Sequence, residues 1–131
     1  MEFKGRLKQG LKDGLFTFFN EDGKKIKEAH YTEDVLHGPF VLWFTNGKKN
    51  IECSYQNGNL NKQYASWYEN GHMQESTTYA NGKLIGSFTY WYENGNIKAE
   101  VTYVHGLLDG KYSAWIADGN KLEEKSYESG L

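Results

Sequence analysis

Apolar and polar residues alternate along short stretches of the chain, which is typical of β-strands with one covered face. Residues 86–92 are Gly-Ser-Phe-Thr-Tyr-Trp-Tyr, and residues 97–103 are Ile-Lys-Ala-Glu-Val-Thr-Tyr. On regular strands, Trp91 points away from the other aromatic side chains of the first stretch. In the second stretch Ile97 falls on the apolar side and Lys98 on the polar side. The pattern predicts two strands joined by the turn between them.

This strand–turn–strand pattern recurs at intervals of 24 residues. Three aromatic columns keep the interval: Phe16, Phe40, Tyr64, Phe88 and Tyr112; Phe19, Trp43, Trp67, Trp91 and Trp115; and Tyr31, Tyr55, Tyr79, Tyr103 and Tyr127. Two glycine columns do the same: Gly23, Gly47, Gly71, Gly95 and Gly119; and Gly14, Gly38, Gly86 and Gly110, with Lys62 in place of the third glycine. The columns predict five repeated hairpins.

The repeat divides the chain into units at about residues 10–33, 34–57, 58–81, 82–105 and 106–131, preceded by one partial strand at 1–9. Each unit carries an Asn-Gly or Asp-Gly pair between its strands. That pair predicts a type I′ turn, in which both central residues have positive φ. The connection between units carries glycine too, except that Asp34 takes the slot once.

The first and last units depart from the pattern. Lys25 and Lys121 stand in the slot that Ile97 fills in the fourth unit. Lysines near the ends of a sheet are typical of protected edges. The first residues occupy second-strand slots, so we expect an edge strand that is exposed or covered by another chain.

Composition limits the class of protein. The chain has 131 residues, 38% hydrophobic and 16% aromatic, with 15 basic residues against 17 acidic ones. We therefore expect the core to be a stack of aromatic rings between neighbouring units.

The charge balance gives no basic stripe for nucleic acid. No apolar run or signal segment indicates a membrane span or secretion, and the lone Cys53 favours a reducing, cytoplasmic compartment.

The repeat resembles a known family. Its pattern, G-x-F/Y-x-x-W-Y-x-N-G-x-x-x-x-E-x-x-Y-x-x-G-x-L-x-G, is similar to the bacterial variant of the MORN repeat, found in proteins often labelled YwqK-type antitoxins. The resemblance covers residues 3–131. It implies an all-β fold of hairpins side by side in one single-layer, twisted antiparallel sheet of about ten or eleven strands. It also implies a binding or scaffolding role without catalytic residues; eukaryotic relatives are linked to membranes, lipid head groups and protein assembly.

No group of residues suggests catalysis, a cofactor or a metal. The histidines occupy four different slots of the repeat: His30, His37, His72 and His105. Cys53 has no histidine in its own unit, and we expect it to be a small half-buried strand residue. The glycine-rich connections precede strands and lack the Gly-Lys-Ser/Thr of a phosphate-binding loop. We therefore expect a protein that is not an enzyme.

Two columns are candidates for a protein-binding surface. The tryptophans are Trp43, Trp67, Trp91 and Trp115, and the glutamates are Glu28, Glu52, Glu100 and Glu124. Equivalent residues of successive units lie about 9.5 Å apart, two strand spacings. The tryptophans could bind a partner, or pack flat on neighbouring strands and shield the thin sheet. The glutamates could attract a basic partner, or form a solvated face diluted by nearby lysines.

The sequence thus favours a non-enzymatic protein-binding module, in its most specific form an antitoxin-like, stoichiometric inhibitor of a toxin or nuclease. Two alternatives stay open. The units could self-associate through the sheet edges as an assembly module, or form a lipid-associated scaffold. Membrane binding is disfavoured because the sequence shows neither a basic cluster nor an amphipathic insert.

Overall fold

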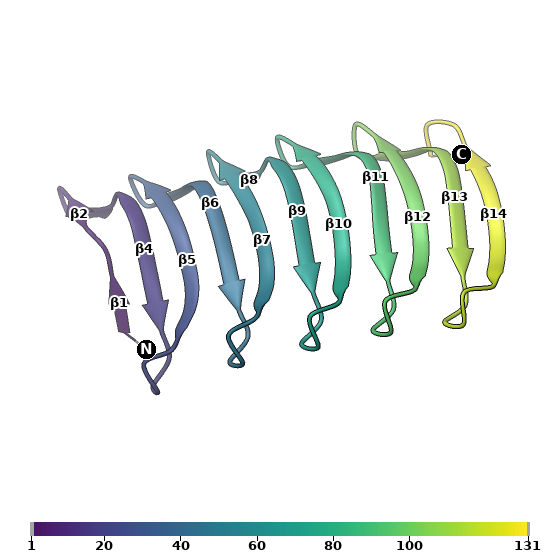
Figure 1. The fold of residues 1–131 in the computed structure, drawn as a ribbon. Coiled ribbons are helices and arrows are strands. Elements are labelled where there is room, and N and C mark those ends of the chain that lie inside the picture. The colour runs from purple at the N-terminus through teal and green to yellow at the C-terminus, as the bar shows by residue number, and fades with distance from the viewer. Residues whose placement is uncertain (1, 131) are drawn as a thin grey trace.

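A computed structural model of the protein describes residues 2–130, in which every regular element is a β-strand (Figure 1). Within that range no helix is long and apolar enough to cross a membrane. The strands are β1 (Glu2–Lys4), β2 (Leu7–Lys8), β3 (Leu11–Lys12), β4 (Gly14–Phe19), β5 (Lys25–Thr32), β6 (Val35–Trp43), β7 (Lys49–Gln56), β8 (Asn59–Leu60), β9 (Lys62–Trp67), β10 (Met73–Ala80), β11 (Lys83–Trp91), β12 (Ile97–Val104), β13 (Leu107–Trp115) and β14 (Lys121–Tyr127).

The strands form one antiparallel sheet in which neighbours in sequence are neighbours in space. The order is β1-β4-β5-β6-β7-β9-β10-β11-β12-β13-β14, with β8 paired to β7 and a separate β2-β3 pair. In Figure 1 the hairpins stand side by side in chain order, and the two ends of the chain lie at opposite ends of the array. The prediction of an all-β, antiparallel, single-layer repeat is confirmed.

The prediction of type I′ turns at the Asn-Gly and Asp-Gly pairs is wrong. The Phe44 carbonyl accepts the Gly47 N–H at 3.0 Å, and the Phe44 N–H donates to the Lys48 carbonyl at 2.8 Å. Gly47 has φ +87°, whereas Asn46 is not among the residues with positive φ. The loop therefore has three residues, a type I turn followed by a glycine bulge. The Asn46 side chain accepts the Lys48 N–H at 2.9 Å, which holds this longer loop in place.

The primed turns lie at the other end of the sheet, between the units. Both central residues there have positive φ, for example Asn57 at +51° and Gly58 at +84°. This geometry fits a two-residue type I′ turn. The six pairs are Gln9-Gly10, Glu33-Asp34, Asn57-Gly58, Asn81-Gly82, His105-Gly106 and Ser129-Gly130. Each unit is therefore joined to the next by a second, tighter hairpin.

A β-bulge in every hairpin corrects the predicted assignment of faces. Trp91 pairs with Ile97 and Tyr90 pairs with Ala99, so Lys98 is an extra residue. Ile97 therefore lies on the tryptophan side, and Lys98 lines a hollow with Tyr90 and Ala99 on the other side. The same register shift recurs in the other four hairpins. The prediction from strict alternation failed for residues such as Ile97, because the bulge reverses the face on which the residues before it in the second strand lie.

One face, which we call the aromatic face, carries the core as a single row of rings and small residues. Ala29 pairs with Phe16 on one side and Phe40 on the other, and both Phe16 and Ala29 are fully buried. Each ring also meets a tyrosine of its own unit edge to face, as Phe16 meets Tyr31 with ring centroids 5.6 Å apart. The full row is Gly5, Phe16, Ala29, Phe40, Cys53, Tyr64, Thr77, Phe88, Val101, Tyr112 and Lys125.

This arrangement corrects the expected stack of rings between neighbouring units. The five edge-to-face pairs lie within single units. Phe3 is an exception, because its ring stacks on Phe16 across the first pair of strands. Rings of successive units are separated by a small side chain that fills the space between them. The row is thus a close-packed alternation of large and small groups.

A second irregularity bends the first strand of each unit. Val101 pairs with Tyr112 but Tyr103 pairs with Leu108, which leaves Gly110 between the two registers with φ +94°. The glycine column holds this bend because only glycine adopts positive φ without strain. Lys62 adopts φ +75° in the third unit and is therefore strained.

Substituting Gly5→Ala should lower the free energy of unfolding by about 1–3 kcal/mol through overpacking. A Cβ at Gly5 would lie 2.4 Å from the Phe16 ring, so β1 or the ring must move. Urea denaturation measures the change. Glu2→Ala, on an exposed residue of the preceding strand β1, is the control and should leave the midpoint unchanged. Equal midpoints for all three proteins would contradict the packing argument.

Substituting Lys62→Gly should raise the free energy of unfolding by about 0.5–1 kcal/mol, because it removes the left-handed strain at a lysine. The matched variant is Gly86→Ala, whose Cβ would meet nothing within 4 Å and whose φ is +74°. It should lower stability by about 1 kcal/mol through strain alone. Thermal or urea unfolding would show stability shifts of opposite sign for the two variants. A Lys62→Gly variant less stable than the wild type would show that the backbone at Lys62 is not strained.

Candidate functional site

The four tryptophans lie on the face opposite the aromatic row, which we call the tryptophan face. Each is half-buried at the end of its strand, next to the three-residue loop. Each pairs across its hairpin with the residue before the bulge. The pairs are Trp43 with Lys49, Trp67 with Met73, Trp91 with Ile97, and Trp115 with Lys121.

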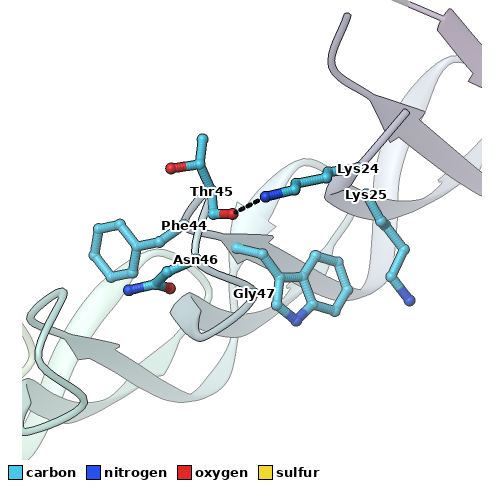
Figure 2. Close-up of a pocket in the computed structure, with 7 residues that line it drawn as sticks. Lys24, Lys25, Phe44, Thr45, Asn46 and Gly47 are labelled. Atoms are coloured by element: carbon cyan, nitrogen blue, oxygen red, sulfur yellow. Dashed lines mark hydrogen bonds between the residues drawn. The ribbon is translucent and has the colours of Figure 1, made fainter. Parts of the chain in front are cut away.

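A pocket of about 320 Å³ lies beside Trp43, between the first hairpin and the next loop. Lys24 and Lys25 approach from the first hairpin, opposite the loop residues from Phe44 to Gly47 (Figure 2). The Lys24 ammonium donates to the Thr45 carbonyl at 3.2 Å. The Lys25 Nζ lies 4.5 Å from the centroid of the Trp43 ring, within cation–π range. The indole is thus held in one orientation while the pocket stays open.

Equivalent pockets recur along the same edge. One of about 320 Å³ lies between Lys48, Lys49, Trp67 and Gly71. Another of about 340 Å³ lies between Ile97, Trp115 and the loop glycines of the last two hairpins. The walls change along the array, since two lysines line each of the first two pockets while Asn96 and Ile97 line the last. The tryptophan face therefore offers the same hollow repeatedly, basic at the N-terminal end and neutral at the C-terminal end.

The predicted glutamate column also lies on the tryptophan face, but lysines neutralise most of it. Lys25 pairs with Glu28 at 3.0 Å, Lys49 pairs with Glu52, and Lys121 pairs with Glu124 at 3.0 Å. The Lys121 hydrogen bond and charge lower the pKa of the exposed Glu124 carboxyl. In the fourth unit, Ile97 occupies the position of the pairing lysine, and Glu100 forms no ion pair within residues 2–130.

Sequence reasoning missed these ion pairs for a physical reason. A lysine three residues before a glutamate lies on the opposite face of a regular strand. The β-bulge between the two residues brings them to the same face. The lysines that pair are Lys25, Lys49 and Lys121, and the first two come directly after Lys24 and Lys48 in the chain.

The loops beside the pockets are tied to one another by side-chain amides. Asn46, Asn70 and Asn94 each donate from Nδ2 to a backbone carbonyl of the next loop, at 2.9–3.0 Å. The same side chains accept an N–H in their own loop. Asp22 in the first loop has no such donor. The asparagine column was interpreted from sequence only as turn-forming, so its role between units was missed.

Cys53 and two of the histidines have contacts within the sheet. Burial, aided by the neighbouring charge of Glu52, raises the pKa of the Cys53 thiol to about 11, against a lowering hydrogen bond from Tyr55. The thiol is 6% exposed and stays protonated near neutral pH. His30 and His72 lie 3.0 and 2.7 Å from backbone carbonyls through Nδ1. Across residues 2–130, no three His, Cys, Asp or Glu side chains are placed to hold a metal ion.

Fold and surface together define the class: a tandem array of β-hairpins in which the strands of each unit pair with those of the next unit. The chain belongs to the MORN repeat variant family, which matches residues 12–33, 36–57, 60–81 and 84–105, more than half of its length. MORN repeats are generally protein or membrane interaction modules. The last hairpin, β13 and β14, lies beyond the matched residues but keeps the same register shifts. A comparison with curated protein sequences gave no match.

Substituting Asn70→Asp should lower the free energy of unfolding by about 1 kcal/mol. The carboxylate keeps the acceptor for the His72 N–H but cannot donate to the Glu93 carbonyl. Urea denaturation measures the loss. The reciprocal control is Asp118→Asn, in a loop with no following hairpin among the described residues, which should change stability by less than about 0.5 kcal/mol. If Asn70→Asp left the free energy of unfolding unchanged, the hydrogen bonds between successive loops would contribute nothing to stability.

Proposed function

We propose that the protein is a non-enzymatic module that binds a partner protein through its tryptophan face. One observation carries this proposal. A pocket of 320–340 Å³ recurs at three junctions between hairpins, each time beside a half-buried tryptophan: Trp43, Trp67 or Trp115. Tryptophan contributes strongly to interface energy because its large ring loses little conformational freedom on binding.

The spacing of the pockets fits an extended partner segment. Equivalent positions in successive units lie about 9.5 Å apart, and an extended chain advances about 3.3 Å per residue. A segment crossing the hairpins at right angles would place every third side chain over a tryptophan pocket. Lys25 lies over the Trp43 ring and Lys121 over the Trp115 ring, so binding at these two pockets would cost little ordering of the receptor.

Charge would contribute to selectivity more than to affinity. Three glutamates of the tryptophan face are paired with lysines, so a partner would meet alternating charges of both signs. Glu100, the column member without a lysine, lies near the neutral C-terminal pocket. A partner with acidic groups over the N-terminal pockets and a basic group near Glu100 would match this surface.

The finer form of the proposal is an antitoxin-like inhibitor that covers the active surface of a toxin or nuclease one to one, in the cytoplasm. Its support is the sequence resemblance together with a long surface able to cover a partner without chemistry of its own. The outer edge of β14, next to an exposed Leu122, supports self-association as the competing function.

The double substitution Trp67→Ala with Trp91→Ala should weaken partner binding roughly a hundredfold or more, because two anchor rings are removed. The measurement is capture of a stoichiometric partner from host lysate by the immobilised protein, followed by a titration of the purified pair. If the partner is a toxin or nuclease, an equimolar amount of the wild type should abolish its activity.

The double substitution Trp67→Phe with Trp91→Phe is the matched control. Phe19 occupies the same slot in the first unit, so the fold accepts this ring. This variant should unfold like the wild type and keep part of the affinity. Capture of the chain alone would favour self-assembly over partner binding. A partner held equally by the alanine variant would move the binding site away from the tryptophan face.

A further inference from the structure

The third unit places two polar residues side by side on the aromatic face. Ser66 occupies a slot filled by Phe18, Leu42, Tyr90 and Ala114 in the other units. Glu75 occupies a slot filled elsewhere by Lys27, Ile51, Ala99 and Glu123. Ser66 pairs with Glu75, and Glu75 pairs with Tyr90 on the next strand. The three side chains therefore lie in a row on the same face.

Ser66 is a buried polar side chain without a partner. It is only 4% exposed, and its Oγ forms no hydrogen bond with any group among residues 2–130. An unmade hydrogen bond of this kind costs on the order of 1–3 kcal/mol. The fold alone gives no reason for this hydroxyl, which lies beside Glu75 on the paired strand.

Glu75 is a half-buried carboxylate without a cation. Within residues 2–130 it forms no ion pair, and burial raises its pKa. Burial, with the added charge of Glu75, raises the pKa of Tyr64 to about 12. The same carboxylate contributes to the raised pKa values of Tyr79 and Tyr90, after burial. Burial and the charges of Glu93 and Glu75 raise the pKa of Tyr68 as well, so four phenol rings stand close enough to sense the Glu75 carboxylate.

Elsewhere on this face the protein supplies its own cation. Lys27, in the slot of Glu75 two units earlier, places Nζ 4.8 Å from the Phe18 centroid and 5.4 Å from that of Phe40. Lys98, the lysine beside Tyr90, reaches over the Tyr92 ring at 5.7 Å. A cation therefore fits between rings at this depth, and the third unit carries the opposite charge among such rings.

We propose that Glu75, Ser66 and the surrounding tyrosines form a receptor for an arginine side chain presented by a partner protein. A guanidinium has five donors in one plane, so it can bind both oxygens of the Glu75 carboxylate side by side. Its plane can also lie against the ring of Tyr64 or Tyr90. Lysine offers a point charge without this planar fork. The receptor lies on the face opposite the tryptophans and is independent of the binding function proposed for them.

The test uses N-acetyl-arginine amide as the probe, titrated into the full-length ¹⁵N-labelled protein and followed by NMR. We expect saturable shifts at the amides of Ser66, Glu75 and Tyr90, and a fall in the pKa of the Glu75 carboxyl when the probe is bound. Glu75→Gln should weaken binding at least tenfold. The fold accepts an uncharged residue there, because Ile51 and Ala99 occupy the slot in other units. Ser66→Ala should weaken binding by a smaller factor.

The controls separate this receptor from the tryptophan face. N-acetyl-citrulline amide, which has the same shape without the charge, should produce no saturable shift. The Trp67→Phe, Trp91→Phe protein should bind the arginine probe as the wild type does, although its affinity for the partner of the tryptophan face is reduced. Absence of shifts with the wild type, equal binding by Glu75→Gln, or equal binding of N-acetyl-lysine amide would each overturn the proposal.

Discussion

A single-layer sheet has no second layer to cover its apolar side, and this constraint governs the structure. The protein meets it within the sheet, by alternating large rings with small side chains from strand to strand. Ala29, Cys53 and Val101 are buried because rings from two neighbouring strands close over them. The rings are covered in turn by a tyrosine of their own unit. Because a ring must have neighbours on both sides, no unit can bury its core alone.

The two ends of each hairpin help to hold this row in register. At one end, tight primed turns join successive units and fix which strands pair. At the other end, the wider loops are joined by amides such as Asn70, which link one loop to the next. Between the two ends, a bulge and a bend shift the register by the same amount in each unit. The irregularities are therefore as periodic as the rings.

The sequence predicted the features that depend on spacing. The interval of 24 residues, the antiparallel hairpins and the aromatic columns follow from composition and periodicity. The features that depend on local backbone geometry could not be predicted in this way. Ile97 and Lys98 exchange faces because of the bulge, and Asn46 lies in a three-residue loop because the glycine after it takes the left-handed conformation. The Lys25–Glu28 pair depends on the same bulge.

Residues that break the pattern gather in the third unit. Lys62 is strained, Ser66 leaves a buried hydroxyl unpartnered, Glu75 is a half-buried charge, and Ser76 interrupts the glutamate column. This unit has two complete hairpins on each side, whereas the end hairpins have a full neighbour on one side only. In a chain of coupled units, the middle link is supported from both directions. Within residues 2–130, the third unit is therefore the one whose neighbours can best compensate for residues that depart from the repeat pattern.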